Sequence, residues 1–160
     1  MRRTFVIFGS ALVVVLLSGS LASSQTITLR FNHQTPATTV GAQVDQWFAE
    51  EVARRTNGRV VIKMFWAEAL GKAKEMLPLL KQGAIDMAGL SPAYYASELP
   101  FFTAPNSIPM AMDSPRQAQI IMHTLLEKIP AFQEEARRHH IKPLFFHVLN
   151  PYVLVCKQSV

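Results

Sequence analysis

The sequence has 160 residues, a mass of 17.9 kDa and 49% hydrophobic residues, enough for one domain with a buried core. Its net charge is +5 at pH 7, and the basic residues are scattered without aromatic interleaving, which argues against nucleic-acid binding. A mildly positive surface suits a small anionic ligand. Cys156 is the single cysteine, so an intramolecular disulfide and a cysteine zinc site are excluded.

The first 24 residues have the order of a secretory signal peptide. Arg2 and Arg3 precede an apolar run over 5–17, and small residues follow, with cleavage expected after Ala22 or Ser24. A membrane-spanning helix needs about 20 apolar residues, so this run is too short for one. The double arginine loosely resembles a twin-arginine signal, but the strong apolar run favours ordinary secretion. We expect an exported chain whose mature part is soluble.

The next two elements are a strand and a helix. Residues 26–32 alternate polar and apolar side chains and predict the first strand. A helix is predicted over 39–56, ended by Asn57 and Gly58. Its expected inward stripe has three- and four-residue spacing and consists of Val44, Trp47, Phe48 and Val52. Its expected outer ion pairs are Glu50 with Arg54 and Glu51 with Arg55.

A second strand is predicted over 59–65 from its β-branched content, followed by a loop over 66–71. The next helix begins near Glu75, with Pro78 in its first turn, or at Lys72, with a kink at that proline. Gly83 is expected to end this helix in a left-handed conformation. The apolar run 85–90 then predicts a strand that is covered on both faces of a sheet.

Prolines and aromatic residues dominate 91–113, which predicts an irregular connection. Ser114 and Pro115 mark the start of a helix that continues to Ile129. A shorter helix is expected over 131–140, with Phe132 and Ala136 facing inward and Glu134, Glu135, Arg137 and Arg138 facing outward. Residues 142–149 predict a fourth strand and 152–156 form a fifth apolar run.

Strands that alternate with helices predict an α/β fold with a mostly parallel sheet and right-handed crossovers. The loops that follow parallel strands share one edge of the sheet, which is where such sheets bind ligands. The residues expected at this edge are His33, Gln34, Thr35, Trp66, Ser91, Tyr94, Tyr95, His147, Asn150 and Tyr152. One of the two adjacent tyrosines is expected to pack in the core and the other to contact a ligand.

The sequence offers little for metal or catalytic chemistry. His139 and His140 are adjacent and point about 100° apart on a helix, so they lack the i,i+4 spacing of a zinc helix. His33 and His147 could meet only through their loops, and no carboxylate is placed beside them. We therefore expect no metal site and no cofactor, and no glycine loop for phosphate or nucleophile elbow is present.

Two other functional classes remain open. A secreted enzyme would use His33, His147 and Asp86, although Asp86 lies in the predicted strand 85–90 and fits a backbone-bonded or edge residue better than a general base. A structural interaction module would dock a partner through the proline-rich segment 91–115.

Several segments together resemble the substrate-binding proteins of tripartite ATP-independent periplasmic (TRAP) transporters, the DctP-like family. The matching segments are 31–33, 51–60, 69–71, 75–77 and 83–87, which read FNH, EVARRTNGRV, ALG, EML and GAIDM. The resemblance implies a non-catalytic periplasmic protein that closes two lobes on a small organic anion, usually a carboxylate. It also implies delivery of that ligand to membrane permease subunits driven by an ion gradient.

Such proteins are about twice this long, so the resemblance implies that 25–150 form lobe I and 151–160 begin the crossover to a missing lobe II. The arginine that pairs with the ligand carboxylate in the family lies in that second lobe. Sialic-acid-binding members have an acid where this chain has Ser91 and an arginine near Val153, so sialic acid is not expected. The ligand contacts implied or placed at the edge are Gln34, Trp66, Ser91, Tyr94, Asn150 and Tyr152.

Overall fold

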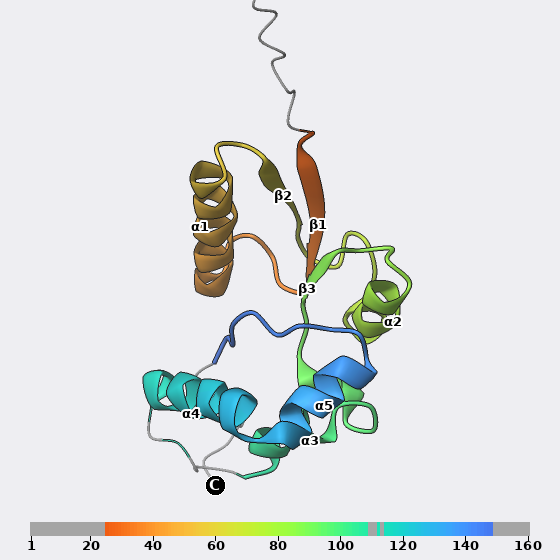
Figure 1. Cartoon of the computed structure of the whole chain (residues 1–160), viewed down its shortest axis with the longest axis vertical. Coiled ribbons are helices and arrows are strands. Elements are labelled where there is room, and N and C mark those ends of the chain that lie inside the picture. Colours follow the sequence, from red (N-terminus) through yellow and green to blue (C-terminus); the bar gives the residue numbers. More distant parts are fainter. Residues whose placement is uncertain (1–24, 109–111, 113, 149–160) are drawn as a thin grey trace, which may run out of the picture.

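The computed structural model describes residues 25–108, 112 and 114–148, and its elements confirm an α/β fold (Figure 1). The strands are β1 (Ile27–His33), β2 (Val60–Phe65) and β3 (Met87–Gly89). The α-helices are α1 (Val40–Arg55), α2 (Met76–Lys81), α3 (Pro100–Thr103), α4 (Pro115–Lys128) and α5 (Pro130–Arg138). Short 3₁₀ helices are η1 (Ala73–Glu75), η2 (Pro92–Tyr95) and η3 (Ala104–Ser107).

The sheet is parallel, as predicted, and β1 is its central strand in the order β2-β1-β3. The pairing with β2 runs from Ile27 opposite Val60 to Asn32 opposite Phe65. The pairing with β3 is shorter and ends with His33 opposite Gly89. All three strands therefore end at the same edge of the sheet, as the alternation of strands and helices predicted.

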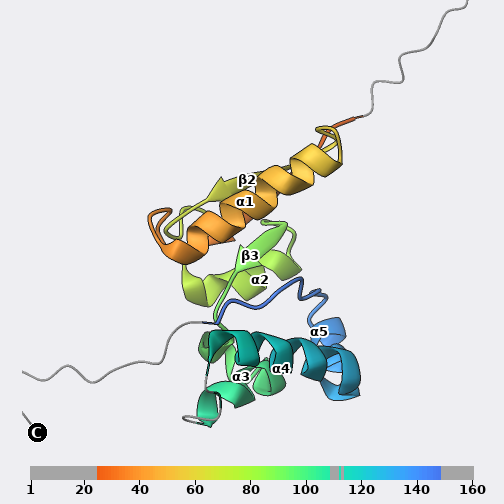
Figure 2. The ribbon, with the colours of Figure 1, turned by 90° about the vertical axis from the view of Figure 1, so that its left-hand side faces the viewer.

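The chain forms two bodies, which Figures 1 and 2 show one above the other. In the upper body α1 covers a face of the sheet over a core of Phe31, Ala49 and Ile62. In the lower body α3, α4 and α5 surround a second core, which consists of Leu77, Tyr95, Leu99, Phe102, Met122, Phe132 and Ala136. The segment 141–148 runs between the two bodies (Figure 1). Among the described residues, no helix has the length and apolar character needed to cross a membrane.

Helix α1 lies where it was expected but turns a different face inward. Thr39 caps its N-terminus by accepting a hydrogen bond from the Ala42 N–H. The buried residues are Ala42, Asp45 and Ala49, whereas Val44 and Trp47 are 51% and 61% exposed. The predicted inward stripe was therefore wrong for these two residues, because small side chains let the helix approach the sheet closely.

The ion pairs on the outer face of α1 were predicted only in part. Glu51 forms the expected ion pair with Arg55 at 2.6 Å, and it forms a second ion pair with Arg54 at 2.6 Å. Glu50 instead accepts a hydrogen bond from the Gln46 side chain.

Helix α2 and the residue that ends it confirm two details of the sequence prediction. Helix α2 begins at Met76, so Pro78 lies in its first turn, and Gly83 follows the helix with φ of +69°. Strand β3 is shorter than the predicted 85–90: the Ile85 N–H still bonds to the Leu79 carbonyl of α2, and η2 begins at Pro92 soon after the strand.

The start of α4 after Ser114 follows from sequence, and the shorter helix predicted over 131–140 is α5, which begins at Pro130 and ends at Arg138. The Ser114 hydroxyl accepts a hydrogen bond from the Gln117 N–H, and Pro115 occupies the first turn of α4. Helix α5 buries Phe132 and Ala136 as predicted, but it also buries Glu135, which was expected to face outward.

The predicted fourth strand is absent from the described part of the chain, where 141–148 is irregular. A strand needs an adjacent strand edge, and this segment is held by side chains instead. The Phe145 ring packs edge-on against Phe48 of α1 at 5.2 Å between centroids, and Phe146 stacks on Phe102 of α3. The side chain of Gln119 donates to the Phe146 carbonyl at 2.9 Å. The apolar run at 152–156 lies outside the described residues.

Glu135 is buried because its carboxylate caps the start of α3. Only 3% of the residue is exposed, and its two oxygens accept the N–H groups of Phe101 at 2.9 Å and Phe102 at 3.1 Å. The first N–H groups of a helix have no partner within the helix, so an anion there is favourable. This capping links α5 to α3 across the lower core.

We predict that Glu135→Ala lowers the free energy of unfolding by about 1–3 kcal/mol, because it leaves two N–H groups without their acceptor. Urea denaturation followed by far-UV circular dichroism measures the change. Glu134→Ala is the matched control, since Glu134 is exposed and pairs only at the surface with Arg137, and it should change stability by less than about 0.5 kcal/mol. Equal effects from the two variants would contradict the capping role.

Candidate functional site

The carboxyl edge of the sheet brings together the loops that follow the three strands. The loop after β2 is tied to the loop after β1 by backbone hydrogen bonds, from Ala67 N–H to the Thr35 carbonyl and from Glu68 N–H to the His33 carbonyl, both at 3.0 Å. Ser91 lies two residues beyond Gly89, which is paired with His33. Open parallel sheets bind ligands at this edge, so it is the candidate ligand rim.

Asn32 of β1 holds the loop that follows β2, a role that the sequence analysis missed. Its side chain is fully buried, its Nδ2 donates to the Gly71 carbonyl at 2.9 Å and its Oδ1 accepts from the Leu70 N–H at 3.2 Å. An amide can serve both a donor and an acceptor of the same loop. Asn32 therefore fixes the end of the β2 loop to the central strand.

His33, the last residue of β1, is the centre of the rim. Its Nδ1 accepts the Thr35 N–H at 3.0 Å, so in the neutral ring the proton lies on Nε2. The ring packs at 5.5 Å from the Trp66 ring and lies against the backbone of Gly89. A Cβ atom at residue 89 would come within 2.2 Å of the His33 ring, so this close approach requires glycine.

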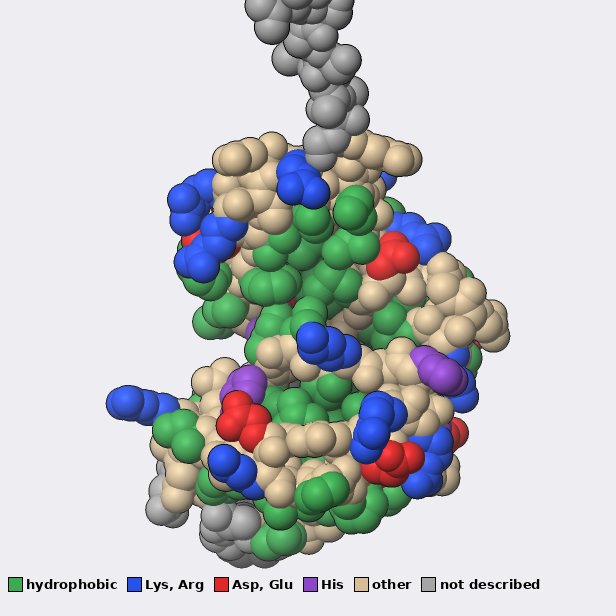
Figure 3. All heavy atoms as spheres, in the orientation of Figure 1, with side chains coloured by type: hydrophobic (Ala, Val, Ile, Leu, Met, Phe, Trp, Pro, Cys, Tyr) green, Lys and Arg blue, Asp and Glu red, His purple; other side chains and the backbone are tan. Residues whose placement is uncertain are grey.

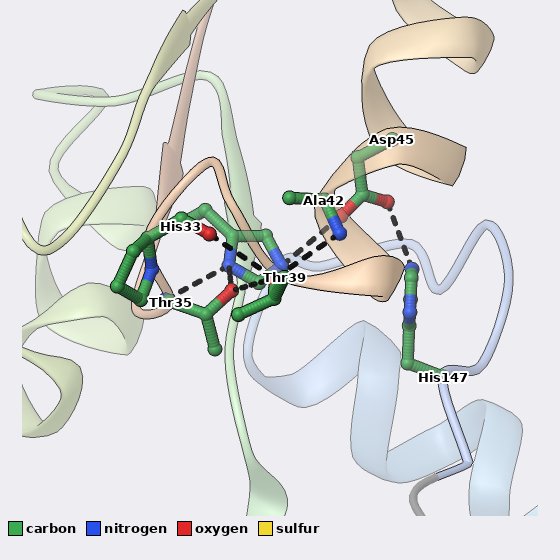
Figure 4. A network of polar contacts seen from close by, with 7 residues as sticks. His33, Thr35, Thr39, Ala42, Asp45 and His147 are labelled. Carbon is green, nitrogen blue, oxygen red and sulfur yellow. Dashed lines mark hydrogen bonds and ion pairs between the residues drawn. The ribbon is translucent and has the colours of Figure 1, made fainter.

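Asp45 lies between His33 and His147, and Figure 4 shows the three side chains converging from β1, α1 and the segment 141–148. The Asp45 side chain is fully buried, and its Oδ1 accepts a hydrogen bond from His147 Nε2 at 2.8 Å. Its Oδ2 lies 3.1 Å from His33 Nε2, an ion-pair distance without the alignment of a good hydrogen bond. The two imidazole rings are 6.3 Å apart.

This arrangement corrects the sequence analysis, which placed no carboxylate beside the two histidines. Asp45 lies twelve residues after His33 in the predicted helix 39–56, and the sequence analysis assigned it no role. A polar residue among the small inward residues of α1 was the available signal, because Asp45 shares a helix face with Ala49 and Ala42.

The charges of the cluster reinforce one another. Burial raises the pKa of Asp45, but the hydrogen bond from His147 and the close approach of the His33 ring, together with the attraction between the carboxylate and both rings, lower it to about 2. The hydrogen bond to Asp45 raises the pKa of His147, which outweighs the opposing effect of its partial burial. Asp45 is therefore an anion at ordinary pH, and His147 holds its proton more tightly than a free histidine.

Asp86, the proposed base of the enzyme alternative, has a different partner. Its carboxylate forms an ion pair with Arg30 Nε at 2.9 Å and accepts the Arg30 backbone N–H at 2.8 Å, and the hydrogen bonds from Arg30 lower its pKa. Asp86 is thus bonded to the backbone, as its sequence position suggested. Within the described residues, no group of three or more His, Cys, Asp or Glu side chains is arranged to hold a metal ion.

Three of the predicted ligand residues lie at the carboxyl edge of the sheet. Gln34 follows His33 directly, and its Oε1 is buried without a hydrogen-bonding partner among the described residues. Trp66 packs on His33, and Ser91 follows β3 at the same edge. Asn150 and Tyr152 lie outside the described residues.

The two adjacent tyrosines have different environments. Tyr95 is buried, and its hydroxyl accepts the Leu77 N–H and donates to the Ala73 carbonyl, so it joins η2 to α2. Tyr94 is 51% exposed and lines an open hollow of about 350 Å³ that also includes Lys81 and His139. Tyr95 is therefore the one that packs in the core.

Comparison with known proteins gives the family. The profile of the bacterial extracellular solute-binding protein family 7, DctP, matches residues 31–148, which is most of the chain. The chain belongs to this family. The match spans both bodies of the fold and includes the whole rim that the structure describes, from β1 to the segment ending at residue 148.

Individual solute-binding relatives support the assignment. A solute-binding protein of Albidiferax ferrireducens is 30% identical over 86 residues, which cover 51% of this chain and 25% of the relative. A TRAP periplasmic solute-binding protein of Desulfovibrio salexigens, solved as an open complex, aligns with a TM-score of 0.62 at 26% identity over 70% of this chain and 34% of its own.

A third relative has a ligand bound. The sugar acid binding protein DctPAm of Advenella mimigardefordensis, in complex with galactonate, aligns with a TM-score of 0.58 at 25% identity over 68% of this chain and 36% of its own. The chain thus spans about a third of the length of these solved structures and a quarter of the length of the curated relative.

We predict that the ion pair of Asp45 and His147 gives the chain a stability maximum in mildly acidic solution. The lowered pKa of Asp45 stabilises the fold above its ordinary value of 3.8, and this contribution disappears as pH falls toward about 2. The raised pKa of His147 stabilises the fold below its ordinary value of 6.5, and this contribution disappears as pH rises through the raised pKa.

Urea denaturation of the wild type and Asp45→Asn across this pH range isolates the contribution. The difference in unfolding free energy should be about 1.5–3 kcal/mol at pH 5, the size expected for a hydrogen bond between charged groups, and should shrink at alkaline pH. Glu50→Gln, an equivalent change on the exposed face of α1, should show no such pH dependence. A constant difference at every pH would rule out the ion pair as its source.

Proposed function

We propose that this chain contributes a ligand-binding lobe of a periplasmic TRAP-type solute-binding protein that captures a small organic acid without catalysis. Residues 1–24 would be the signal peptide and 25–150 the lobe, with 151–160 leading toward a second lobe. Membrane permease subunits would receive the ligand. The observation that carries the proposal is the common rim, where Gln34, Trp66 and Ser91 follow three parallel strands of a family 7 chain.

The unsatisfied oxygen of Gln34 supports a ligand with hydroxyl groups. A buried acceptor without a donor costs about 1–3 kcal/mol, and a ligand hydroxyl would remove that cost. The Gln34 Nε2 group is in turn suited to a carboxylate oxygen. A sugar acid has both groups, and a relative of this chain binds galactonate. We therefore propose a hydroxylated carboxylate as the substrate class.

The enzyme alternative has less support. It needs His33, His147 and Asp86 together, but Asp86 is held by Arg30. Arg30 lies three residues before His33 on β1, about 10 Å along the strand. The carboxylate beside the histidines is Asp45, which is fully buried and already bonded.

We predict that D-galactonate binds the purified chain more tightly than D-galactose, which has similar hydroxyl groups but no carboxylate. Isothermal titration calorimetry measures both. Gln34→Ala should weaken galactonate binding about tenfold, since a hydrogen bond to a charged group contributes about 1.5–3 kcal/mol. Gln46→Ala, which removes an exposed glutamine bonded to Glu50, is the matched control and should leave the affinity unchanged.

Equal affinities for the acid and the sugar would contradict a carboxylate site. Unchanged binding by Gln34→Ala would contradict the placement of the ligand at this rim.

A further inference from the structure

Asp45 touches both the strand that carries the ligand rim and the segment that returns from the lower body. His33 ends β1, His147 lies in 141–148, and each imidazole faces a different oxygen of the same carboxylate (Figure 4). The rings themselves are 6.3 Å apart and in edge contact. The carboxylate therefore bridges two segments that are more than a hundred residues apart in the chain.

A carboxylate is not needed for packing at this position. The other buried residues of α1 are Ala42 and Ala49, which pack against the sheet without polar groups. A fully buried carboxylate is costly unless it is paired, because it has lost its water. The position of Asp45 is thus stabilised by the hydrogen bond from His147 and by the close His33 ring.

His33 transmits this constraint to the ligand rim. Its Nδ1 holds the Thr35 N–H, and Thr35 follows Gln34. Its ring packs on Trp66 and against Gly89, two residues before Ser91. A shift of the His33 ring would therefore move all three parts of the rim.

We propose that Asp45 is a positioning residue for the ligand rim and couples the protonation of His147 to the geometry of Gln34, so that ligand affinity falls when His147 loses its proton. This inference rests on the proposed function for its consequence in binding. The coupling itself concerns the chain without ligand.

Few other charged groups surround Asp45, His33 and His147 in the described part of the chain. In the described part of the chain, the side chains that lower the pKa of Asp45 are His147 and His33, and the carboxylate that raises the pKa of His147 is that of Asp45. The other groups packed on the two imidazoles are aromatic and uncharged, namely Phe31, Trp66 and Phe145. Thr35 contributes an uncharged hydroxyl and its backbone N–H, and the Thr39 hydroxyl bonds to that of Thr35.

NMR titration of the full chain tests the coupling without a ligand. The ring signals of His147 and the amide signals of Gln34 would be followed from pH 5 to pH 9 in the wild type, Asp45→Asn and Glu50→Gln. In the wild type and in Glu50→Gln, the Gln34 signals should shift with the same midpoint as the His147 ring. In Asp45→Asn, the His147 midpoint should fall and the Gln34 signals should no longer follow it.

Gln34 signals that ignore the His147 titration in the wild type would overturn the proposal. Folding of Asp45→Asn is checked in the same spectra, and His147→Gln provides a second variant if that protein is unfolded. In His147→Gln the pH-dependent shift at Gln34 should be lost while Asp45 remains in place. Persistence of the shift in that variant would equally overturn the proposal.

Calorimetry with D-galactonate then tests the consequence. The wild-type affinity should fall on the order of fivefold to tenfold between pH 6 and pH 9, a typical size for coupling between two sites, and the His147→Gln affinity should not change over that range. Absence of galactonate binding at every pH would contradict the proposed substrate class and leave the NMR result to decide the coupling. Binding that is independent of pH in the wild type would overturn the inference.

Discussion

The central position of β1 is the constraint on which the rest of the structure depends. Because β1 pairs in parallel with β2 on one side and β3 on the other, the ends of all three strands lie at one edge. The loops that follow the three strands therefore start close together at this edge. Asn32 and His33, the two side chains that anchor the rim, lie at the end of this one strand.

Buried polar groups join elements that apolar packing alone would leave independent. Asn32 ties the β2 loop to β1, Glu135 ties α5 to α3, and Asp45 ties α1 to His33 and His147. Each group is costly in the interior unless it is hydrogen-bonded, so each restricts the geometry more strongly than a methyl group would. The apolar clusters supply most of the favourable burial, and these polar groups select the arrangement.

The segment 141–148 shows how the two bodies are connected. It contacts α1 through Phe145 and His147 and the lower helices through Phe146. The hollow between the bodies is visible in the space-filling view of Figure 3. The ion pair of Asp45 and His147 joins the segment 141–148 to α1.

The sequence by itself determined the local elements and their order. Ser114 with Pro115, Gly83 and Pro78 act through nearby backbone groups, so their effects could be predicted from a few neighbouring residues. Alternation of strands and helices was sufficient for the parallel sheet and for the shared edge with Gln34, Trp66 and Ser91. The family resemblance was also evident from short segments, and the profile match confirms it.

Only the tertiary structure decided which faces are buried and which segments become strands. The inward face of α1 depends on how closely the helix approaches the sheet, which favours Ala42 and Ala49 over Trp47. Glu135 and Asp45 are buried because their partners come from distant segments, and residues 142–148 form no strand because aromatic contacts hold them in place of a neighbouring strand edge. These outcomes depend on contacts between residues far apart in the chain, which no local pattern contains.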